Sequence, residues 1–190
     1  MNDITTRKNE VRKQLKEITR GLSEEYMSSA SDIIAGKCIE SSEFKNADRI
    51  FIFVSMKGEP DTTKVIERAL EDGKAVYVPR CLGNGIMEAI RLRSFEDLEP
   101  GHYGILEPRA GLKPAEPSEY DSETAAAFIP CVAAAKDGKR LGHGAGYYDR
   151  FLEGRSMKKL MLVYGKQLLD DIPCDSHDLV MDRVISELDE

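Results

Sequence analysis

Residues 49–56 read RIFIFVSM, a short run of β-branched and aromatic residues that predicts a buried strand. A helix is expected from about Thr62, because apolar side chains recur on one face of the turns that follow: Val65, Ile66, Ala69 and Leu70. Gly73 ends this helix, and AVYVP (75–79) predicts a second buried strand that Pro79 terminates. A strand, a helix and a strand in this order are typical of a parallel sheet covered by helices.

The rest of the chain continues this alternation in both directions. Two helices are expected first, one with Val11, Leu15, Ile18 and Leu22 at helical spacing and a second that Ser23 caps. Four later apolar segments predict strands: IMEAIRL (86–92), AAAFIPC (125–131), KLMLVYG (159–165) and, near the sheet edge, DLVMDRVIS (178–186). Residues 99–122 hold four prolines and are expected to be mostly loop. We therefore expect one α/β domain, residues 1–190, with a largely parallel sheet between helices.

The composition argues against several classes of protein. A net charge of −7 over 190 residues disfavours broad nucleic-acid binding. No apolar run reaches the roughly 18 residues of a membrane helix, and residues 1–15 lack the apolar core of an export signal. The four cysteines form no C-x-x-C pair, so we expect free thiols in a reducing cytoplasm: Cys38, Cys81, Cys131 and Cys174. An anionic ligand would need a local cluster of basic side chains and backbone N–H groups.

The most informative segment is DGKRLGHGAGYYDR (137–150), a glycine loop between a predicted strand and a short predicted helix. Its alternating glycines, Gly142, Gly144 and Gly146, let the backbone turn sharply and approach a ligand closely. The start of the following helix favours phosphate. The spacing matches neither common nucleotide-binding glycine motif, so spacing alone explains a surface turn as well as a phosphate loop.

The side chains around the glycines favour the phosphate loop. Arg140 and Arg150 flank it and can pair with phosphate oxygens. Asp149 can hold a Mg²⁺ ion that accompanies a nucleotide. Two adjacent tyrosines and two opposite charges within residues 146–150 are more than a turn requires.

The segment R-L-G-x-G-x-G-Y-Y-D-R, from Arg140 to Arg150, resembles the signature of the 5-formyltetrahydrofolate cyclo-ligases at every fixed position. Lys8 and Arg12 resemble the N-terminal K-x-x-x-R of that family, which reaches ATP. Three further segments agree in order and spacing: FVSMKGEPDT (53–62), GILEP (104–108) and DLVMD (178–182). The resemblance covers about residues 7–186. It implies a Rossmann-like three-layer α/β sandwich, the fold of sugar-phosphate isomerases and coenzyme A transferases.

The resemblance also implies a reaction. The formyl oxygen of 5-formyltetrahydrofolate attacks the γ-phosphate of ATP, nitrogen 10 closes the ring, and phosphate leaves. The products are 5,10-methenyltetrahydrofolate, ADP and phosphate. Mg²⁺ is the expected cofactor and ATP the co-substrate. The expected partners are these small molecules, with no nucleic acid and no membrane, and the expected state is a monomer.

Site residues follow from the same resemblance. ATP binding is assigned to Lys8, Arg12, Arg140, Leu141, Gly142, His143, Gly144, Ala145, Gly146, Tyr147 and Tyr148. Arg140 and Lys8 are expected to be catalytic, with Arg140 on the γ-phosphate. Folate binding is assigned to Met56, Glu59, Asp61, Tyr147 and Tyr148, and the metal to Asp149 and Asp182.

Each assignment has a simpler structural alternative. Asp61 suits an N-cap of the helix that follows, and one of the two tyrosines would serve as core filling. Lys8 and Arg12 share a helical face that could simply be solvated. Asp182 could be a solvent-facing strand residue, since Asp178 nearby is equally acidic. Asp182 is preferred because it alternates with two valines on a strand, and a partly buried carboxylate needs a partner.

Three positions depart from the family pattern. Ala134-Ala135 stands where Phe-Asp is common, Cys81 replaces a frequent aromatic, and Asp61 stands where some members carry Glu. These differences keep a non-catalytic or altered folate-binding protein open. A sugar-phosphate or coenzyme A enzyme of the same fold is the other alternative, because fold alone does not separate these activities.

Overall fold

The computed structural model describes residues 3–101 and 105–188, so Gly104 of the GILEP segment lies outside the described residues. Its main sheet has six strands in the order β11-β9-β6-β1-β2-β3. Their bounds are β1 Arg49–Ile52, β2 Ala75–Gly83, β3 Ile86–Leu92, β6 Ala125–Pro130, β9 Lys158–Leu162 and β11 Arg183–Ile185. Only β3 runs antiparallel to its neighbour within this sheet. The predicted largely parallel α/β sheet is confirmed.

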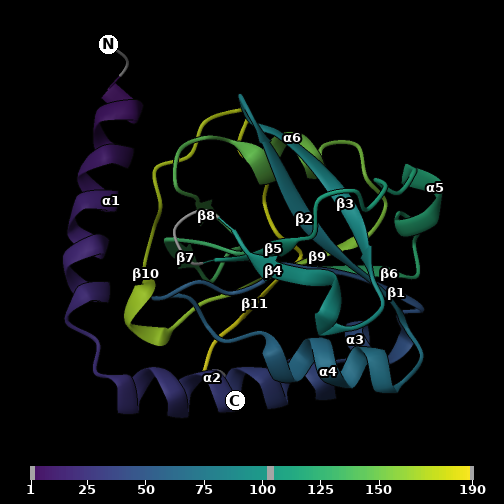
Figure 1. Ribbon diagram of the computed structural model, residues 1–190. Helices are drawn as coiled ribbons and strands as arrows, with labels where there is room; N and C mark the ends of the chain where they lie inside the picture. The colour runs from purple at the N-terminus through teal and green to yellow at the C-terminus, as the bar shows by residue number, and fades with distance from the viewer. Residues whose placement is uncertain (1–2, 102–104, 189–190) are drawn as a thin grey trace.

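Helices cover both faces of the sheet (Figure 1). One face carries α2 Glu24–Glu40, α3 Ser42–Asn46 and α4 Thr63–Glu71, and the other carries α5 Pro117–Tyr120 and α6 Tyr147–Leu152. The strand side chains alternate between the two: Ile50 and Ile52 pack with the first group, and Phe51 with the second. Burial on both faces explains why RIFIFVSM is apolar throughout rather than alternating.

Helix α1, Asp3–Arg20, stands to one side of these layers (Figure 1). Leu15 is its fully buried residue and packs in a small cluster with Ala133 and Leu141. Gln167, in the 3₁₀ turn η3 Gly165–Gln167, donates a hydrogen bond of 2.9 Å to Thr19 near the end of α1. In the part of the chain described, no helix is long and apolar enough to cross a membrane.

A small sheet supports the glycine loop. It contains β7 Ala133–Ala135, β8 Arg140–Leu141 and β10 Leu168–Leu169 in the order β10-β7-β8. Ala134 pairs with Arg140 across β7 and β8, and β10 lies on the other side of β7. This sheet is absent from the sequence prediction, because strands of two or three residues carry no detectable periodicity.

The predicted end of the second strand is wrong. Strand β2 continues past Pro79 to Gly83. Its pairing with β1 ends at Tyr77, so Pro79 lies where one side of β2 has no partner, and its missing N–H costs little there. Most of the described residues in 99–122 are loop, as predicted. The segment also includes most of a hairpin, β4 Leu98–Pro100 with β5 Leu106–Pro108, and helix α5; the 3₁₀ turn η1 Phe95–Asp97 precedes it.

The last strand is also shorter than predicted. Strand β11 begins at Arg183, and residues 178–182 form a loop before it. Met181 donates its backbone N–H to Gly138 in the turn between β7 and β8, at 2.9 Å. Because that partner belongs to a distant segment, local periodicity could not indicate the start of the strand.

Candidate functional site

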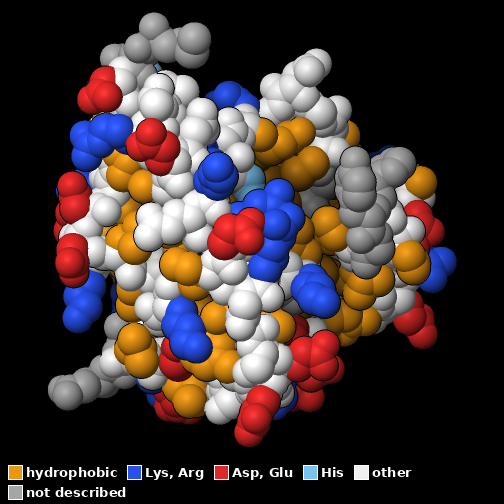
Figure 2. Space-filling model, turned by 90° about the vertical axis from the view of Figure 1, so that its left-hand side faces the viewer, with side chains coloured by type: hydrophobic (Ala, Val, Ile, Leu, Met, Phe, Trp, Pro, Cys, Tyr) orange, Lys and Arg blue, Asp and Glu red, His pale blue; other side chains and the backbone are white. Residues whose placement is uncertain are grey.

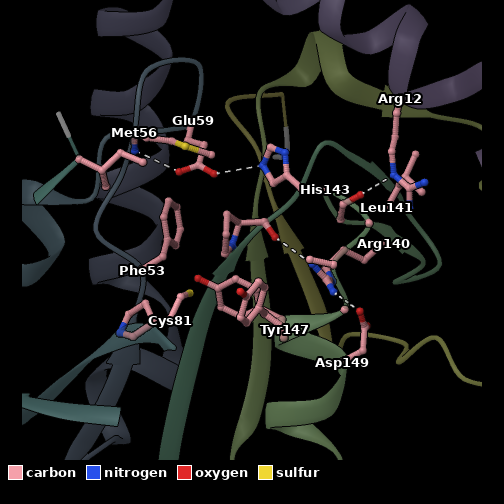
Figure 3. Close-up of a pocket in the computed structure, with 18 of the residues that line it drawn as sticks. Arg12, Phe53, Met56, Glu59, Cys81, Arg140, Leu141, His143, Tyr147 and Asp149 are labelled. Carbon is pink, nitrogen blue, oxygen red and sulfur yellow. Dashed lines mark hydrogen bonds and ion pairs between the residues drawn. The ribbon is translucent and has the colours of Figure 1, made fainter. Parts of the chain in front are cut away.

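A pocket of about 460 Å³ opens at the carboxyl ends of the central strands (Figure 3). Phe53 follows β1, Pro130 ends β6, and Pro79 and Cys81 lie in the outer half of β2. Strand order reverses between β1 and β6, and ligands of open α/β sheets bind at such a switch point. Helix α1, the glycine loop and residues 105–107 complete the walls.

The glycine loop adopts the backbone geometry that its glycines allow. Gly144 has φ of +104° and Gly146 has φ of +67°, a region that side chains disfavour. Arg12 of α1 donates from Nε to the carbonyl of Gly142 at 2.9 Å. Arg150 donates from Nε to Gly85 at 3.1 Å and from Nη2 to Ala145. The loop is therefore anchored on both sides, unlike a free surface turn.

Arg140 lies beneath this loop, with a side chain only 3% exposed. Its Nη2 forms an ion pair of 2.8 Å with Asp149, and its Nη1 donates to the Pro130 carbonyl at 3.3 Å. Its Nε is buried and has no hydrogen-bond partner among the described residues. The guanidinium also lies 5.7 Å from the ring centre of Tyr148. A buried donor without a partner is a position where a ligand oxygen would be stabilised.

Lys8 and Arg12, the two residues of α1 that are predicted to bind ATP, both line the pocket. Lys8 forms ion pairs with Asp175, at 2.8 Å, and with Asp178. Burial lowers the pKa of Lys8, but hydrogen bonds to these two carboxylates outweigh it and raise the pKa above its ordinary value. Burial lowers the pKa of Arg12, and the charge of Asp178 opposes that shift. The face of α1 that carries Lys8 and Arg12 is therefore turned toward the pocket and is not simply solvated.

Of the predicted folate residues, Met56 and Glu59 line the pocket. Glu59 accepts a 3.1 Å hydrogen bond from the backbone N–H of Met56 and lies 3.7 Å from Nε2 of His143 (Figure 3). The Glu59 side chain is 8% exposed, whereas that of His143 is 60% exposed. The pair faces across the pocket, from the loop after β1 to the glycine loop.

Asp61, by contrast, is not among the residues that line the pocket. Its Oδ1 accepts hydrogen bonds from the backbone N–H and the hydroxyl of Thr63, at 2.9 and 2.7 Å. Burial raises the pKa of Asp61, but the Thr63 and Ser55 hydrogen bonds outweigh it and hold the pKa below its ordinary value. The N-cap of α4 is Thr62, and Asp61 holds the first helical residue from one position before it. The structure therefore separates Asp61 from Met56 and Glu59.

Tyr147 and Tyr148 both line the pocket and are both partly buried. Tyr148 also packs against the cores on both faces of the sheet, whereas Tyr147 packs against one. Burial raises the pKa of Tyr148 well above its ordinary value, with Glu59 and Cys81 adding to the rise and Arg140 opposing it. Tyr148 is thus a neutral phenol that is also part of the core.

The two residues predicted to bind the metal lie apart. Asp149 lines the pocket, but Asp182 does not. Asp182 is exposed before β11, where it accepts a 2.7 Å hydrogen bond from Lys159 at the amino end of β9, away from the carboxyl ends that form the pocket. The expected partial burial of Asp182 is wrong, because the neighbouring Val180 is 60% exposed.

Asp178, the equally acidic neighbour of Asp182, lines the pocket instead. Together with Asp149 it offers two carboxylates beside a phosphate-type loop. Mg²⁺ favours one or two carboxylates with waters and phosphate oxygens, so the donor set fits that ion. No cluster of three metal-binding side chains occurs in the described part of the chain.

The pocket also includes residues that the sequence analysis did not assign. Ile105, Leu106 and Glu107 reach it from the segment around β5, and Thr5 from α1. The GILEP segment resembles the family, but no local pattern places it or Thr5 in the pocket, because the hairpin and α1 approach the site only in the folded chain. Ala134-Ala135 is fully buried in β7 and does not line the pocket. Its departure from the family pattern therefore alters the support of the loop rather than the pocket wall.

Basic side chains gather locally although the chain is acidic overall. On the face where α1 lies, Lys and Arg side chains cluster near the centre beside a band of hydrophobic ones (Figure 2). The pocket lining includes Lys8, Arg12 and Arg140 together with apolar residues such as Met56 and Leu106. One end of the pocket suits an anion and the other a flat, partly apolar molecule.

Comparison with known proteins finds relatives along nearly the whole chain. The model of the 5-formyltetrahydrofolate cyclo-ligase family matches residues 4–187. The 5-formyltetrahydrofolate cyclo-ligase of Mus musculus is 31% identical over 97% of this chain and 95% of the mouse protein. A probable 5-formyltetrahydrofolate cyclo-ligase of Caenorhabditis elegans is 32% identical over 98% of this chain and 96% of its own length.

Solved structures show the same fold. The NMR structure of Aquifex aeolicus 5,10-methenyltetrahydrofolate synthetase superposes with a TM-score of 0.81 at 30% identity, covering 96% of this chain and 90% of that one. The Mycoplasma pneumoniae 5,10-methenyltetrahydrofolate synthetase has a TM-score of 0.75 at 23% identity, covering 95% and 98%. At 23% identity, the similarity to the Mycoplasma pneumoniae structure supports the fold alone.

Proposed function

Because this chain belongs to the 5-formyltetrahydrofolate cyclo-ligase family, we propose that its pocket converts 5-formyltetrahydrofolate to 5,10-methenyltetrahydrofolate with ATP. ADP and phosphate are the other products. The observation that carries the proposal is the buried guanidinium of Arg140, whose Nε has no hydrogen-bond partner among the described residues and which lies beneath an anchored glycine loop. Such a group can donate a hydrogen bond from Nε to a phosphoryl oxygen without first breaking one that it already makes.

The reaction needs positioning and charge neutralisation more than a covalent nucleophile. The formyl oxygen displaces ADP from the γ-phosphorus, which forms a carbon–oxygen–phosphorus link. Nitrogen 10 then attacks the formyl carbon and the carbon–oxygen bond breaks. Phosphate leaves with that oxygen and takes up the proton that nitrogen 10 loses. Arg140 and Lys8 stabilise the charge on the transferring group, and Arg12 helps to hold the loop around the nucleotide.

The folate would lie against the opposite wall. Met56 packs on the pterin ring, and the carboxylate of Glu59 accepts hydrogen bonds from its N–H edge. Tyr147, the less embedded of the two tyrosines, is available to stack on either ligand. This arrangement brings the formyl group toward the glycine loop, because Glu59 and His143 face each other across a short gap.

A direct test is to mix the protein with MgATP and 5-formyltetrahydrofolate and to follow the absorbance of methenyl-folate. ADP release is measured in parallel, with and without folate. Absorbance growth together with folate-dependent ADP release supports the proposal. Folate binding without ADP release would instead identify a non-catalytic folate-binding protein, and ADP release that ignores folate would point to other chemistry of the same fold.

Mg²⁺ would supply charge neutralisation at the phosphates, and Asp149 and Asp178 are the residues proposed to hold it. Asp149→Asn and Asp178→Asn should each raise the Mg²⁺ concentration for half-maximal activity by at least about tenfold, since each removes a charged contact. Asp182→Asn is the matched control and should leave the Mg²⁺ titration unchanged. If Asp182→Asn shifts the titration and Asp178→Asn does not, the pair proposed here is wrong.

The cellular setting is proposed on simpler grounds. All four cysteines are free, which suits a reducing compartment such as the cytoplasm. Elements of a single chain form the pocket, so a monomer would suffice for the reaction.

A further inference from the structure

The loop after β1, residues 53–62, carries Met56 and Glu59 to the pocket, and a row of hydroxyl groups holds it from behind. Tyr164, just after β9, is 1% exposed and donates a 2.8 Å hydrogen bond to the backbone carbonyl of Glu59. Its hydroxyl also lies 3.0 Å from Oγ of Ser31 in α2. Ser31 Oγ in turn accepts a 3.0 Å hydrogen bond from the backbone N–H of Asp61.

The chemistry of the two ends fixes the direction of every hydrogen bond in this row. The Glu59 carbonyl can only accept, so the Tyr164 proton points to it. The N–H of Asp61 can only donate, so Ser31 accepts there and gives its own proton to Tyr164. Each hydroxyl therefore accepts one hydrogen bond and donates one. The two ends of the row bind the same loop, at the Glu59 carbonyl and at the Asp61 N–H.

The base of the loop is held differently. Thr62 Oγ1 donates to the Phe53 carbonyl at 2.8 Å and accepts from the backbone N–H of Ser55 at 3.2 Å. These are contacts within the loop itself. The segment from Glu59 to Asp61 also has loop contacts, with Met56 and Ser55. It is held in addition from outside the loop by Ser31 and Tyr164, which are 30 and 105 positions away along the chain from their respective partners.

The glycine loop has separate anchors. Arg12 holds Gly142, and Arg150 holds Ala145 and ties the loop to Gly85. Neither Tyr164 nor Ser31 lines the pocket or takes part in these contacts. A change in the hydroxyl row would therefore move one wall of the pocket and leave the other in place.

We propose that Tyr164, with Ser31, is a positioning residue that sets where the Glu59 carboxylate meets the folate. The proposal rests on the proposed function, in which Glu59 binds the folate. The Glu59 side chain is nearly buried, and its carboxylate accepts a hydrogen bond from the N–H of Met56 in the same loop. The place of the carboxylate therefore depends on where the backbone of this loop lies. Loss of the Tyr164 hydroxyl leaves the Glu59 carbonyl without this donor and lets the carboxylate leave its place.

The test is Tyr164→Phe, which removes one oxygen and keeps the ring. The KM for 5-formyltetrahydrofolate should rise about tenfold, the usual scale for a lost buried hydrogen bond. The KM for ATP should stay within about twofold, because the glycine loop has its own anchors. Tyr26→Phe is the matched control. Its ring lies 5.8 Å from that of Tyr164, but its hydroxyl contacts Glu187 and not the loop.

A merely structural role predicts a different pattern. Tyr164→Phe and Tyr26→Phe would then lower the melting temperature alike and leave the folate KM unchanged, which would overturn the proposal. Equal rises in the KM for folate and for ATP would overturn it as well. If Tyr164→Phe does not fold, Ser31→Ala carries the same expectation, because it removes the neighbouring hydroxyl of the row. Failure of the unaltered protein to turn over folate would instead refute the proposed function.

Discussion

Replacing Gly144 by valine is expected to weaken ATP binding by about 100-fold, measured by calorimetric titration of MgATP. Gly144 has φ of +104°, where a β-branched side chain is strained. An added Cβ would also lie 3.3 Å from the guanidinium carbon of Arg12, which anchors the neighbouring Gly142. The loop would have to change shape at the point where phosphate is proposed to approach the backbone.

Gly154→Val is the matched control for this substitution. Gly154 also has a positive φ, +69°, and an added Cβ would meet nothing within 4 Å. It follows α6 and does not line the pocket. Both variants should lose some stability through backbone strain, but only Gly144→Val should lose ATP affinity. Equal ATP affinity in the Gly144 variant and the unaltered protein would show that the loop does not cradle the nucleotide.

Arg140→Lys is expected to lower turnover by roughly 100-fold or more, with a smaller change in the KM for ATP. Lysine keeps the positive charge but cannot reach Asp149, the Pro130 carbonyl and a ligand oxygen together, as the fork of the guanidinium can. Charge on the phosphoryl group is redistributed during transfer, and a fixed guanidinium stabilises it most in the transition state. Steady-state kinetics with varied ATP measure both parameters.

Lysine tests the role of Arg140 better than alanine does, because the Arg140 side chain is buried. Arg140→Ala would leave a cavity and an unpaired Asp149, so lost activity could reflect damage to the fold. Arg183→Lys is a suitable control, since Arg183 forms an exposed ion pair with Glu43 and does not line the pocket. An unchanged turnover with a raised KM in Arg140→Lys would mark Arg140 as a residue that binds ground state and transition state equally.

Much of the fold was predictable from the chain alone. Apolar runs of strand length alternate with helical patterns, and burial on both faces of the sheet requires such runs. Ser23 was predictable as an N-cap, and its Oγ accepts from the backbone N–H of Tyr26 at 3.1 Å. The glycine loop was predictable for the same reason: its positive φ angles and its neighbouring charges lie within one short segment.

The sequence was less informative where a side chain had two possible uses. Glu59 and Asp61 are both acidic and two positions apart, yet Glu59 lines the pocket and Asp61 accepts from the first residue of α4. Asp178 and Asp182 were equally acidic candidates, but only Asp178 lines the pocket, whereas Asp182 had been preferred. Strand periodicity placed Asp182 on a buried face, but the strand begins only at Arg183.

By itself, then, the sequence determined the alternation of strands and helices, the glycine loop and the family signature from Arg140 to Arg150. These depend on neighbours a few positions apart, whose preferences act before the chain folds. Only the tertiary structure decided that Lys8 meets Asp178 and that Tyr164 holds the loop of Glu59. Those contacts join residues more than 100 positions apart. They form only when the sheet brings the carboxyl ends of its strands together, so no local preference in the chain encodes them.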